Sequence, residues 1–204
     1  MQFEPIYKTT EQINSEAESF LINYCPSHVI PMPIEEIIDL KLGIDIIPIP
    51  GLKDAFEKVG LIDAFISSDF TSISVDKYIQ EKRQNRYRFT LAHEVGHMLL
   101  HGYLYSKFKF NTIDEWLEAI EQMPTGERLM VEWQANEFAG LVLVPRISLK
   151  TEFPKALKET EKIISMSYKN RPDLLLDSTI FSLANKFEVS EEVMRIRIER
   201  DCLK

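Results

Sequence analysis

The sequence His93-Glu94-Val95-Gly96-His97 constrains this chain more than any other stretch of its 204 residues. On a helix, two histidines four positions apart lie on one face, about one turn from each other. Their ring nitrogens can therefore bind a single metal ion together, and Zn²⁺ is the ion that this pattern typically holds. The glutamate beside the first histidine can act as a general base toward water that the metal activates.

A catalytic zinc site also needs a third protein ligand and one open coordination position. His101 is the nearest candidate in the sequence. It lies about 6 Å further along a helix axis than His97, however, so a straight helix cannot bring all three rings to one ion. We therefore expect His101 to lie behind the ligands or near the end of the helix.

Carboxylates on a following helix are better candidates for the third ligand. Three glutamates lie there: Glu127, Glu132 and Glu137. We favour Glu132, because Asn136 follows it by one helical turn and could orient a ligating histidine through its other ring nitrogen. Small residues at Ala135 and Ala139 would let this helix approach the first one closely, and close packing also explains Gly96, which costs a helix about 1 kcal/mol relative to alanine.

Composition excludes several classes of protein. A net charge of −8 argues against a large phosphate-binding surface. No apolar run reaches the roughly 18 residues that span a membrane, and the first residues lack the basic and apolar regions of a signal peptide. The two cysteines, Cys25 and Cys202, lie far apart in the sequence, which predicts reduced thiols. We therefore expect a cytoplasmic protein that does not bind a membrane.

The basic run at residues 82–88 is a local exception to the acidic balance. We interpret it as a solvated helix face. The alternatives are a docking patch for an acidic partner, or an arginine of the active site at Arg88. Tyr103, Tyr105 and Arg88 are candidates to stabilise a developing oxyanion, and the sequence does not choose among them.

Hydrophobic periodicity predicts an α+β fold with a small three-stranded sheet. We expect helices at 11–24 (capped by Thr10), 33–42 (stopped by Gly43), 78–101 (ended by Gly102), 127–144 and 154–168, with a capping box opening a short helix at 112–115. We expect strands at 44–49, 60–67 and 72–76, the last two joined by a turn at 68–71. After a linker at 170–173, the pattern predicts helix, tight turn and helix, the second helix capped by Ser190.

Two blocks of this sequence resemble the ImmA/IrrE metallopeptidases. Residues 88–101 read RFTLAHEVGHMLLH, which fits the family pattern R-F-T-x-A-H-E-x-G-H. Residues 132–139 read EWQANEFA, which fits E-x-x-A-N-x-F-A. Val-Leu-Val-Pro at 142–145 replaces the usual L-L-M-P ending, a conservative change in packing. The unit Leu-Ala-x-x-Phe-x-Val-Ser at 183–190 matches the helix-turn-helix-like tail common in the family.

The resemblance implies a zincin-like metallopeptidase domain at 1–150, with its HExxH motif on the active-site helix. It implies a helical segment with a helix-turn-helix-like end at 151–204. By motif position, His93, His97 and Glu132 would bind zinc, Glu94 would be the catalytic base, and Asn136 would hold a ligating histidine in place. Family members typically cleave a helix-turn-helix repressor, often encoded nearby, and so derepress its genes. We therefore expect a zinc endopeptidase with such a repressor as its partner.

Two other functions remain as alternatives. The first is a DNA-binding regulator that uses residues 178–201, but this span carries four basic against five acidic residues, unlike a phosphate-binding unit. The second is a partner-binding regulator whose zinc site is intact and whose peptidase activity is negligible. Cleavage of a neighbouring repressor in a single turnover would separate the second alternative from a protease.

Overall fold

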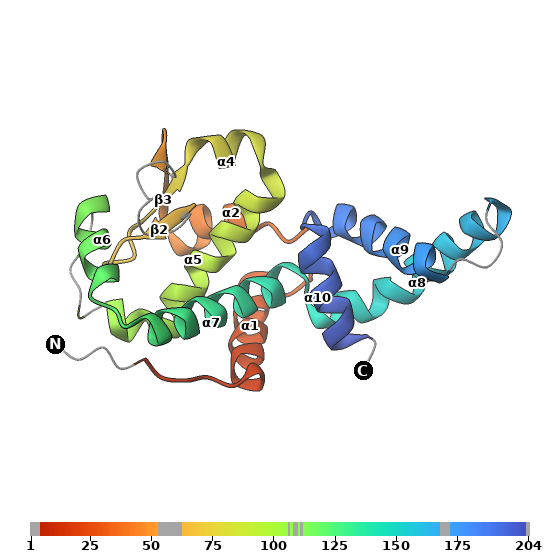
Figure 1. Cartoon of the computed structure of the whole chain (residues 1–204), viewed down its shortest axis with the longest axis horizontal. Helices are drawn as coiled ribbons and strands as arrows, with labels where there is room; N and C mark the ends of the chain where they lie inside the picture. Colours follow the sequence, from red (N-terminus) through yellow and green to blue (C-terminus); the bar gives the residue numbers. More distant parts are fainter. Residues whose placement is uncertain are drawn as a thin grey trace.

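The computed structural model describes residues 5–52, 63–105, 107, 110, 112–167 and 172–202. Along the chain the described elements are α1 (Thr10–Tyr24), α2 (Ile34–Glu36), the π-helical turn η1 (Ile37–Leu42), β1 (Asp45–Ile49), β2 (Ala64–Ile66), β3 (Ser72–Asp76), α4 (Lys77–Lys82), α5 (Gln84–Tyr105), α6 (Ile113–Glu121), α7 (Thr125–Leu143), α8 (Arg146–Ser167), α9 (Pro172–Phe187) and α10 (Glu191–Asp201). The molecule is elongated, with the sheet toward one end and α8, α9 and α10 at the other (Figure 1). Within the described residues, no helix has the length and apolar character that a membrane crossing requires.

The small sheet has the strand order β1-β3-β2 and confirms the predicted α+β class. β1 runs parallel to β3, and β2 runs antiparallel to β3 with Phe65 opposite Ser74. The predicted turn between β2 and β3 forms around Asp69, whose carboxylate accepts hydrogen bonds from the Ser67 and Thr71 hydroxyls. Of the strand expected at 60–67, residues 60–62 lie outside the described residues, and the observed strand is Ala64–Ile66.

The start of α1 differs from the prediction by one residue. Thr9, not Thr10, is the N-cap: its hydroxyl accepts from the Gln12 backbone N–H, and the Gln12 side chain accepts from the Thr9 N–H. Both threonines suit a cap, but only Thr9 has a glutamine three positions later to complete the capping box. The expected apolar positions of α1, including Ile13 and Phe20, are buried.

The region expected as one helix at 78–101 forms two helices. Arg83 leaves the helical conformation (φ −135°, ψ 58°) between α4 and α5. Gly102 does not end α5, which continues to Tyr105. That prediction was wrong because Leu104 and Tyr105 extend the buried face of the helix for another turn, and burial outweighs the weak helix-ending preference of glycine.

The helix predicted at 154–168 starts earlier than expected. α8 begins at Arg146 instead of 154, so Pro154 lies inside the helix. Leu149, Phe153 and Ala156 form its buried stripe and explain why it starts early. The boundary predicted between residues 150 and 151 falls within α8 and stays a prediction. Of the linker expected at 170–173, residues 170–171 lie outside the described residues, and Pro172 and Asp173 already belong to α9 (Pro172–Phe187), so the prediction was wrong there.

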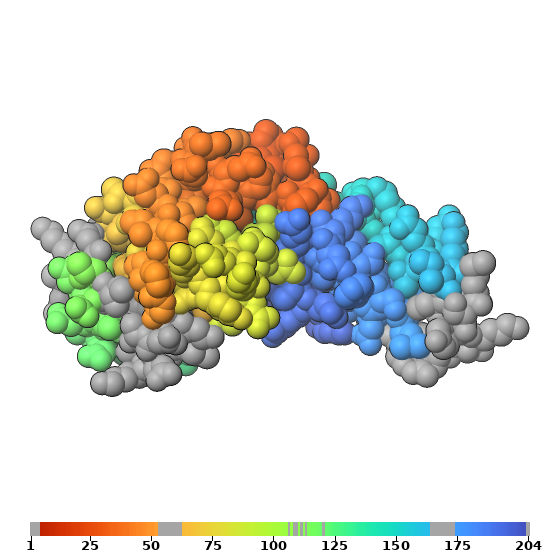
Figure 2. Space-filling model, turned by 90° about the horizontal axis from the view of Figure 1, so that it is seen from above, coloured from red at the N-terminus to blue at the C-terminus, as the bar shows by residue number. Residues whose placement is uncertain are grey.

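The helix-turn-helix-like end forms as predicted. Ser190 caps α10 by accepting from the Val193 N–H, and Glu188 adopts a left-handed conformation (φ 53°) in the turn between α9 and α10. Seen from above, α10 and the turn that joins it to α9 lie beside the start of α5 (Figure 2). The Asn85 side chain donates to the Val189 carbonyl across this junction, at 3.0 Å.

Helices α5 and α7 pack closely against each other at Gly96. A Cβ placed on Gly96 would lie 3.2 Å from the Cα and the carbonyl oxygen of Ala135 and 3.2 Å from the Phe138 ring. These neighbours are backbone atoms and a fully buried ring, which cannot move aside easily. The expected close packing of a neighbouring element against Gly96 is therefore confirmed, and that element is α7.

We predict that Gly96→Ala lowers the free energy of unfolding by about 1 kcal/mol or more, because overpacking outweighs the gain in helix propensity. Urea denaturation would measure the change. Gly126→Ala in α7 is the matched control, since nothing lies within 4 Å of its added Cβ, and it should be at least as stable as the unchanged chain. If Gly96→Ala is as stable as the unchanged chain, the contact between α5 and α7 at Gly96 is not tight.

Candidate metal centre

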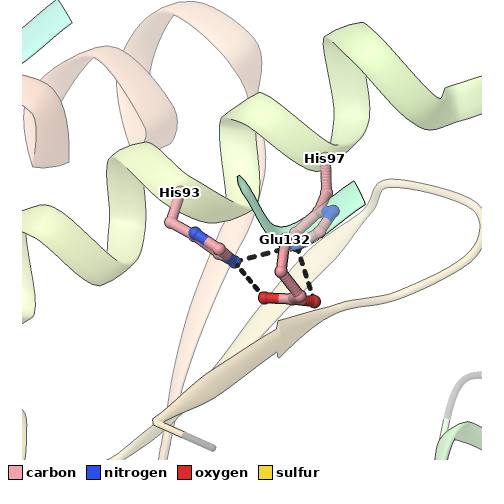
Figure 3. A group of neighbouring side chains, drawn as sticks. All are labelled: His93, His97 and Glu132. Carbon is pink, nitrogen blue, oxygen red and sulfur yellow. Dashed lines mark hydrogen bonds and ion pairs between the residues drawn. The ribbon is translucent and has the colours of Figure 1, made fainter. Parts of the chain in front are cut away.

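Two helices bring three side chains of the sequence motifs together (Figure 3). α5 carries His93 and His97, and α7 carries Glu132. The Glu132 carboxylate lies 3.2 Å from His93 Nε2 and 3.5 Å from His97 Nε2. The two Nε2 atoms are 2.8 Å apart. One ligand atom from each residue lies within 4.8 Å of the others, so the three could hold one metal ion.

The geometry of this group fits a zinc ion. Nitrogen and oxygen ligands lie about 2.0–2.1 Å from Zn²⁺, so the ligands of a tetrahedral site are roughly 3.4 Å apart. The two nitrogen–oxygen distances, 3.2 and 3.5 Å, agree with that spacing. The distance between the two Nε2 atoms would have to widen by roughly half an ångström. Two imidazoles and one carboxylate are also a donor set that suits Zn²⁺.

Asn136 holds His93 from the side away from Glu132. Its Oδ1 lies 2.9 Å from His93 Nδ1. An amide oxygen only accepts hydrogen bonds, so the proton is on Nδ1. This bond fixes the orientation of the ring, with Nε2 directed at Glu132 and His97. The structure thus brings Asn136 to the position that the sequence spacing indicated.

Glu94 lies beside this group and is 5% exposed. The backbone N–H of Ile66, in β2, donates to Glu94 Oε2 at 2.9 Å. Burial raises the pKa of Glu94, while the charges of His97 and His93 lower it less. A carboxyl group with a raised pKa is suited to both accepting and returning a proton. No sequence pattern indicated Ile66, because it contributes only a backbone group.

Without a metal, His93 and Glu132 form an ion pair. Burial lowers the pKa of His93, but the hydrogen bond and charge of Glu132 outweigh burial and raise that pKa to about 9. Burial likewise raises the pKa of Glu132, and the charges and hydrogen bonds of His97 and His93 reverse this and hold it well below its usual range. Without a metal, the His93 ring therefore carries a second proton at neutral pH, and a metal ion must displace it to bind.

The structure places the other candidate ligands elsewhere. His101 is fully buried, and its Nδ1 lies 3.2 Å from His97 Nδ1, on the opposite side of that ring from Glu132. Burial lowers the pKa of His101 to about 3, so its ring is neutral. Glu137 forms ion pairs with Arg197 and Arg200 of α10. Neither His101 nor Glu137 belongs to the group of possible metal ligands among the described residues.

Of the three candidates for an oxyanion donor, only Tyr105 is next to the site. Its ring centroid lies 5.9 Å from that of His97. Burial, and the charges of Glu94 and Glu132, raise the pKa of Tyr105 well above its usual value, so the phenol stays protonated. Arg88 instead donates to the Met32 carbonyl at 2.7 Å, and the Tyr103 hydroxyl accepts from the Ile6 N–H.

The basic run at 82–88 is only partly a solvated face. Residues 82–86 are exposed, as expected, but Tyr87 is buried and Arg88 is half-buried. The Tyr87 hydroxyl donates to Glu35 at 2.7 Å, and Arg86 forms a bidentate ion pair with Asp63. The expectation of a fully solvated face was wrong for Tyr87 and Arg88, because their partners come from segments far away in the sequence.

Comparison with known proteins shows the family of this chain. A model of a peptidase family, described as the IrrE N-terminal-like domain, matches residues 78–199. The chain belongs to this family. The match contains both helices that carry the candidate metal ligands, and it confirms the resemblance to the ImmA/IrrE metallopeptidases and the α+β fold.

The chain is also similar to individual proteins, among them a metalloprotease and a transcriptional regulator. The radiation response metalloprotease IrrE of Deinococcus radiodurans is 26% identical over 141 residues, which are 68% of this chain and 38% of that protein. A Mycobacterium tuberculosis transcriptional regulator superposes with a TM-score of 0.51 at 15% identity, over 92% of this chain and 46% of that one. The chain thus spans less than half the length of either protein, and the second likeness concerns the fold alone.

We predict that, if this chain is given zinc, it binds the ion more tightly as the pH rises. In the metal-free protein the pKa of His93 is about 9, above the usual value of about 6.5, so His93 carries a proton at neutral pH. Because metal must displace that proton, affinity should rise up to about tenfold per pH unit from about pH 7 and level off near pH 9. Competition with a chelator would measure it.

Glu132→Gln is the control for this pH dependence. Removing the carboxylate charge removes the main cause of the raised pKa of His93, so zinc affinity should be weaker and should level off closer to pH 7. If the unchanged chain binds zinc equally tightly at about pH 7 and at about pH 9, the ion pair between His93 and Glu132 is contradicted.

Proposed function

We propose that this chain is a zinc-dependent endopeptidase that cleaves a helix-turn-helix transcriptional repressor. The observation that carries the proposal is the group of His93, His97 and Glu132, with the carboxyl group of Glu94 buried beside it. Membership of the peptidase family and the similarity to a metalloprotease support it. The repressor as substrate rests on the resemblance to the ImmA/IrrE metallopeptidases.

In this proposal His93, His97 and Glu132 hold the zinc ion. When bound, zinc would polarise the scissile carbonyl and lower the pKa of water. Glu94 takes the proton from the attacking water and passes it to the leaving amine. The Ile66 N–H fixes the orientation of the Glu94 carboxyl group, and the raised pKa of Glu94 favours the return of the proton.

Tyr105 is the residue that we assign to the oxyanion. It lies beside His97, and it keeps its proton because burial and the neighbouring carboxylates raise its pKa. A protonated phenol can donate a hydrogen bond to an oxygen that gains negative charge in the transition state. Arg88 and Tyr103 bind backbone groups elsewhere, which leaves Tyr105 as the best supported of the three.

A cleft of about 560 Å³ lies between α5, α7 and α10. Phe89, Trp133, Val193 and Ile196 give it apolar walls, and Asn136 lines it as well as contacting His93. Clefts of this size commonly bind ligands. We propose that side chains of the protein substrate enter this cleft while the scissile bond lies at the metal site.

The ion pairs of the arginines in α10 argue against a DNA-binding role. Arg195 pairs with Asp177 at 2.8 Å, and Arg200 pairs with Glu137 of α7. Arg197 pairs with Asp201 and is only 3% exposed. These side chains bind carboxylates of the same chain, and DNA phosphates would have to compete with those ion pairs. The proposed location is the cytoplasm, where free thiols such as those of Cys25 and Cys202 persist.

We predict that Glu94→Gln binds zinc like the unchanged chain and cleaves at least roughly 100-fold more slowly, because only the base is lost. The measurement is single-turnover cleavage of the helix-turn-helix protein encoded beside this chain's gene, with zinc content determined on the same samples. Tyr105→Phe serves as a second variant: it should keep the metal and lower the cleavage rate by losing one hydrogen bond to the oxyanion.

Equal cleavage by the unchanged chain and Glu94→Gln would exclude Glu94 as the base. If the zinc-loaded chain binds the repressor and leaves it uncut in a single turnover, the partner-binding alternative is correct. A Tyr105→Phe variant that cleaves at the unchanged rate would remove Tyr105 from the mechanism and leave Glu94 untouched.

A further inference from the structure

We propose that Gln134, acting through His101, keeps the proton of His97 on Nδ1 and so leaves Nε2 unprotonated toward the metal. The backbone carbonyl of Ile6 fixes the orientation of Gln134. Gln134 and His101 would then be positioning residues of the site. The proposal rests on the proposed function in one respect, namely that His97 is a metal ligand. It concerns four groups in a line, which we call the Ile6–Gln134–His101–His97 chain.

The direction of every hydrogen bond in this chain follows from its first member. A backbone carbonyl can only accept, and the Gln134 Nε2 lies 3.3 Å from the Ile6 oxygen. The amide group of Gln134 is therefore oriented with its nitrogen toward Ile6. Its oxygen, Oε1, faces the other way and lies 3.4 Å from His101 Nε2.

His101 must then carry its proton on Nε2. The Gln134 Oε1 only accepts, so His101 Nε2 is the donor. The ring is completely buried and its two ring nitrogens contact Gln134 and His97, with no carboxylate on either. A charged ring is costly there, and a neutral imidazole has only one N–H. The Nδ1 of His101 is therefore an acceptor.

The last bond of the chain fixes His97. Its Nδ1 lies 3.2 Å from His101 Nδ1, and since the latter accepts, His97 Nδ1 carries the proton. The lone pair of His97 is then on Nε2, which faces His93 Nε2 at 2.8 Å and Glu132 at 3.5 Å. This is the form of the ring that can bind a metal there.

In both candidate ligand histidines, an amide of α7 thus keeps a proton on Nδ1, the ring nitrogen that faces away from the metal site. Asn136 accepts from Nδ1 of His93 directly, whereas Gln134 acts on His97 through a third histidine. Gln134 is two positions from both Glu132 and Asn136, so it projects from roughly the opposite side of the helix. It is completely buried there, which explains why a polar amide is retained in the core.

The Ile6–Gln134–His101–His97 chain also connects the metal site to the N-terminal segment. Ile6 accepts from Gln134, its N–H donates to Tyr103 of α5, and the neighbouring Tyr7 ring stacks on Trp133 of α7 with centroids 6.4 Å apart. The segment therefore lies against both helices that carry the metal ligands. Its carbonyl at Ile6 is the group that makes the orientation of Gln134 unambiguous.

The test is the tautomer of His97 in the metal-free protein, measured by ¹⁵N NMR of the imidazole rings. The chain has four histidines, so single substitutions can assign them. We expect His97 with a protonated Nδ1 and a bare Nε2, and His101 with the reverse. The variant is Gln134→Met, which keeps the volume and removes the acceptor. In it we expect a mixed or reversed His97 tautomer and a 10–100-fold loss of zinc affinity.

Leu141→Met, also buried in α7, is the matched control for repacking and should change neither the tautomer nor zinc affinity. A protonated Nε2 on His97 in the unchanged chain would overturn the proposal, whether or not Gln134→Met folds. An unchanged tautomer and unchanged zinc affinity in a folded Gln134→Met would overturn the role of Gln134. The NMR result does not depend on cleavage or bound metal, so failure of the proposed protease function would be recognised separately.

Discussion

The close contact of α5 with α7 at Gly96 is the constraint on which the site depends. Two of the candidate ligands come from α5 and the third from α7, so the distance between these helices sets the distance between ligand atoms. Metal–ligand distances lie within about 0.2 Å of their usual values. A Cβ at Gly96 would lie only 3.2 Å from the Ala135 backbone, so α7 would have to shift by a few tenths of an ångström and carry Glu132 away from both histidines.

Helix α7 supplies the site with several groups at once. Glu132 faces the histidines, Asn136 orients His93, and Gln134 contacts His101 on another side of the helix. Glu137 binds Arg197 and Arg200 and so joins the same helix to α10. The C-terminal helices are thereby held beside the cleft next to Asn136, which suits them to contact a bound protein substrate in the proposed function.

The sequence predicted the parts of this arrangement that follow from local spacing. The i, i+4 spacing placed His93 and His97 on one helical face, and the same spacing linked Glu132 to Asn136 on the next helix. The cap at Ser190 followed from residue type alone. The length of α5 did not follow from residue type, because burial of Leu104 and Tyr105 extends the helix beyond Gly102. Gln134 could not be recognised as part of the site, since its partner Ile6 is 128 residues away. The bond from Ile66 to Glu94 uses a backbone N–H, which leaves no pattern in the sequence.

The central claim is that one zinc ion is bound by residues from two helices. X-ray absorption spectroscopy of the zinc-loaded chain, with zinc content measured for the unchanged protein and Glu132→Ala, tests it most directly. The account predicts one zinc per chain with two imidazole nitrogens and carboxylate oxygen at about 2.0–2.2 Å, and a loss of tight binding in Glu132→Ala. Sulfur in the coordination sphere, or equally tight binding by Glu132→Ala, would contradict it.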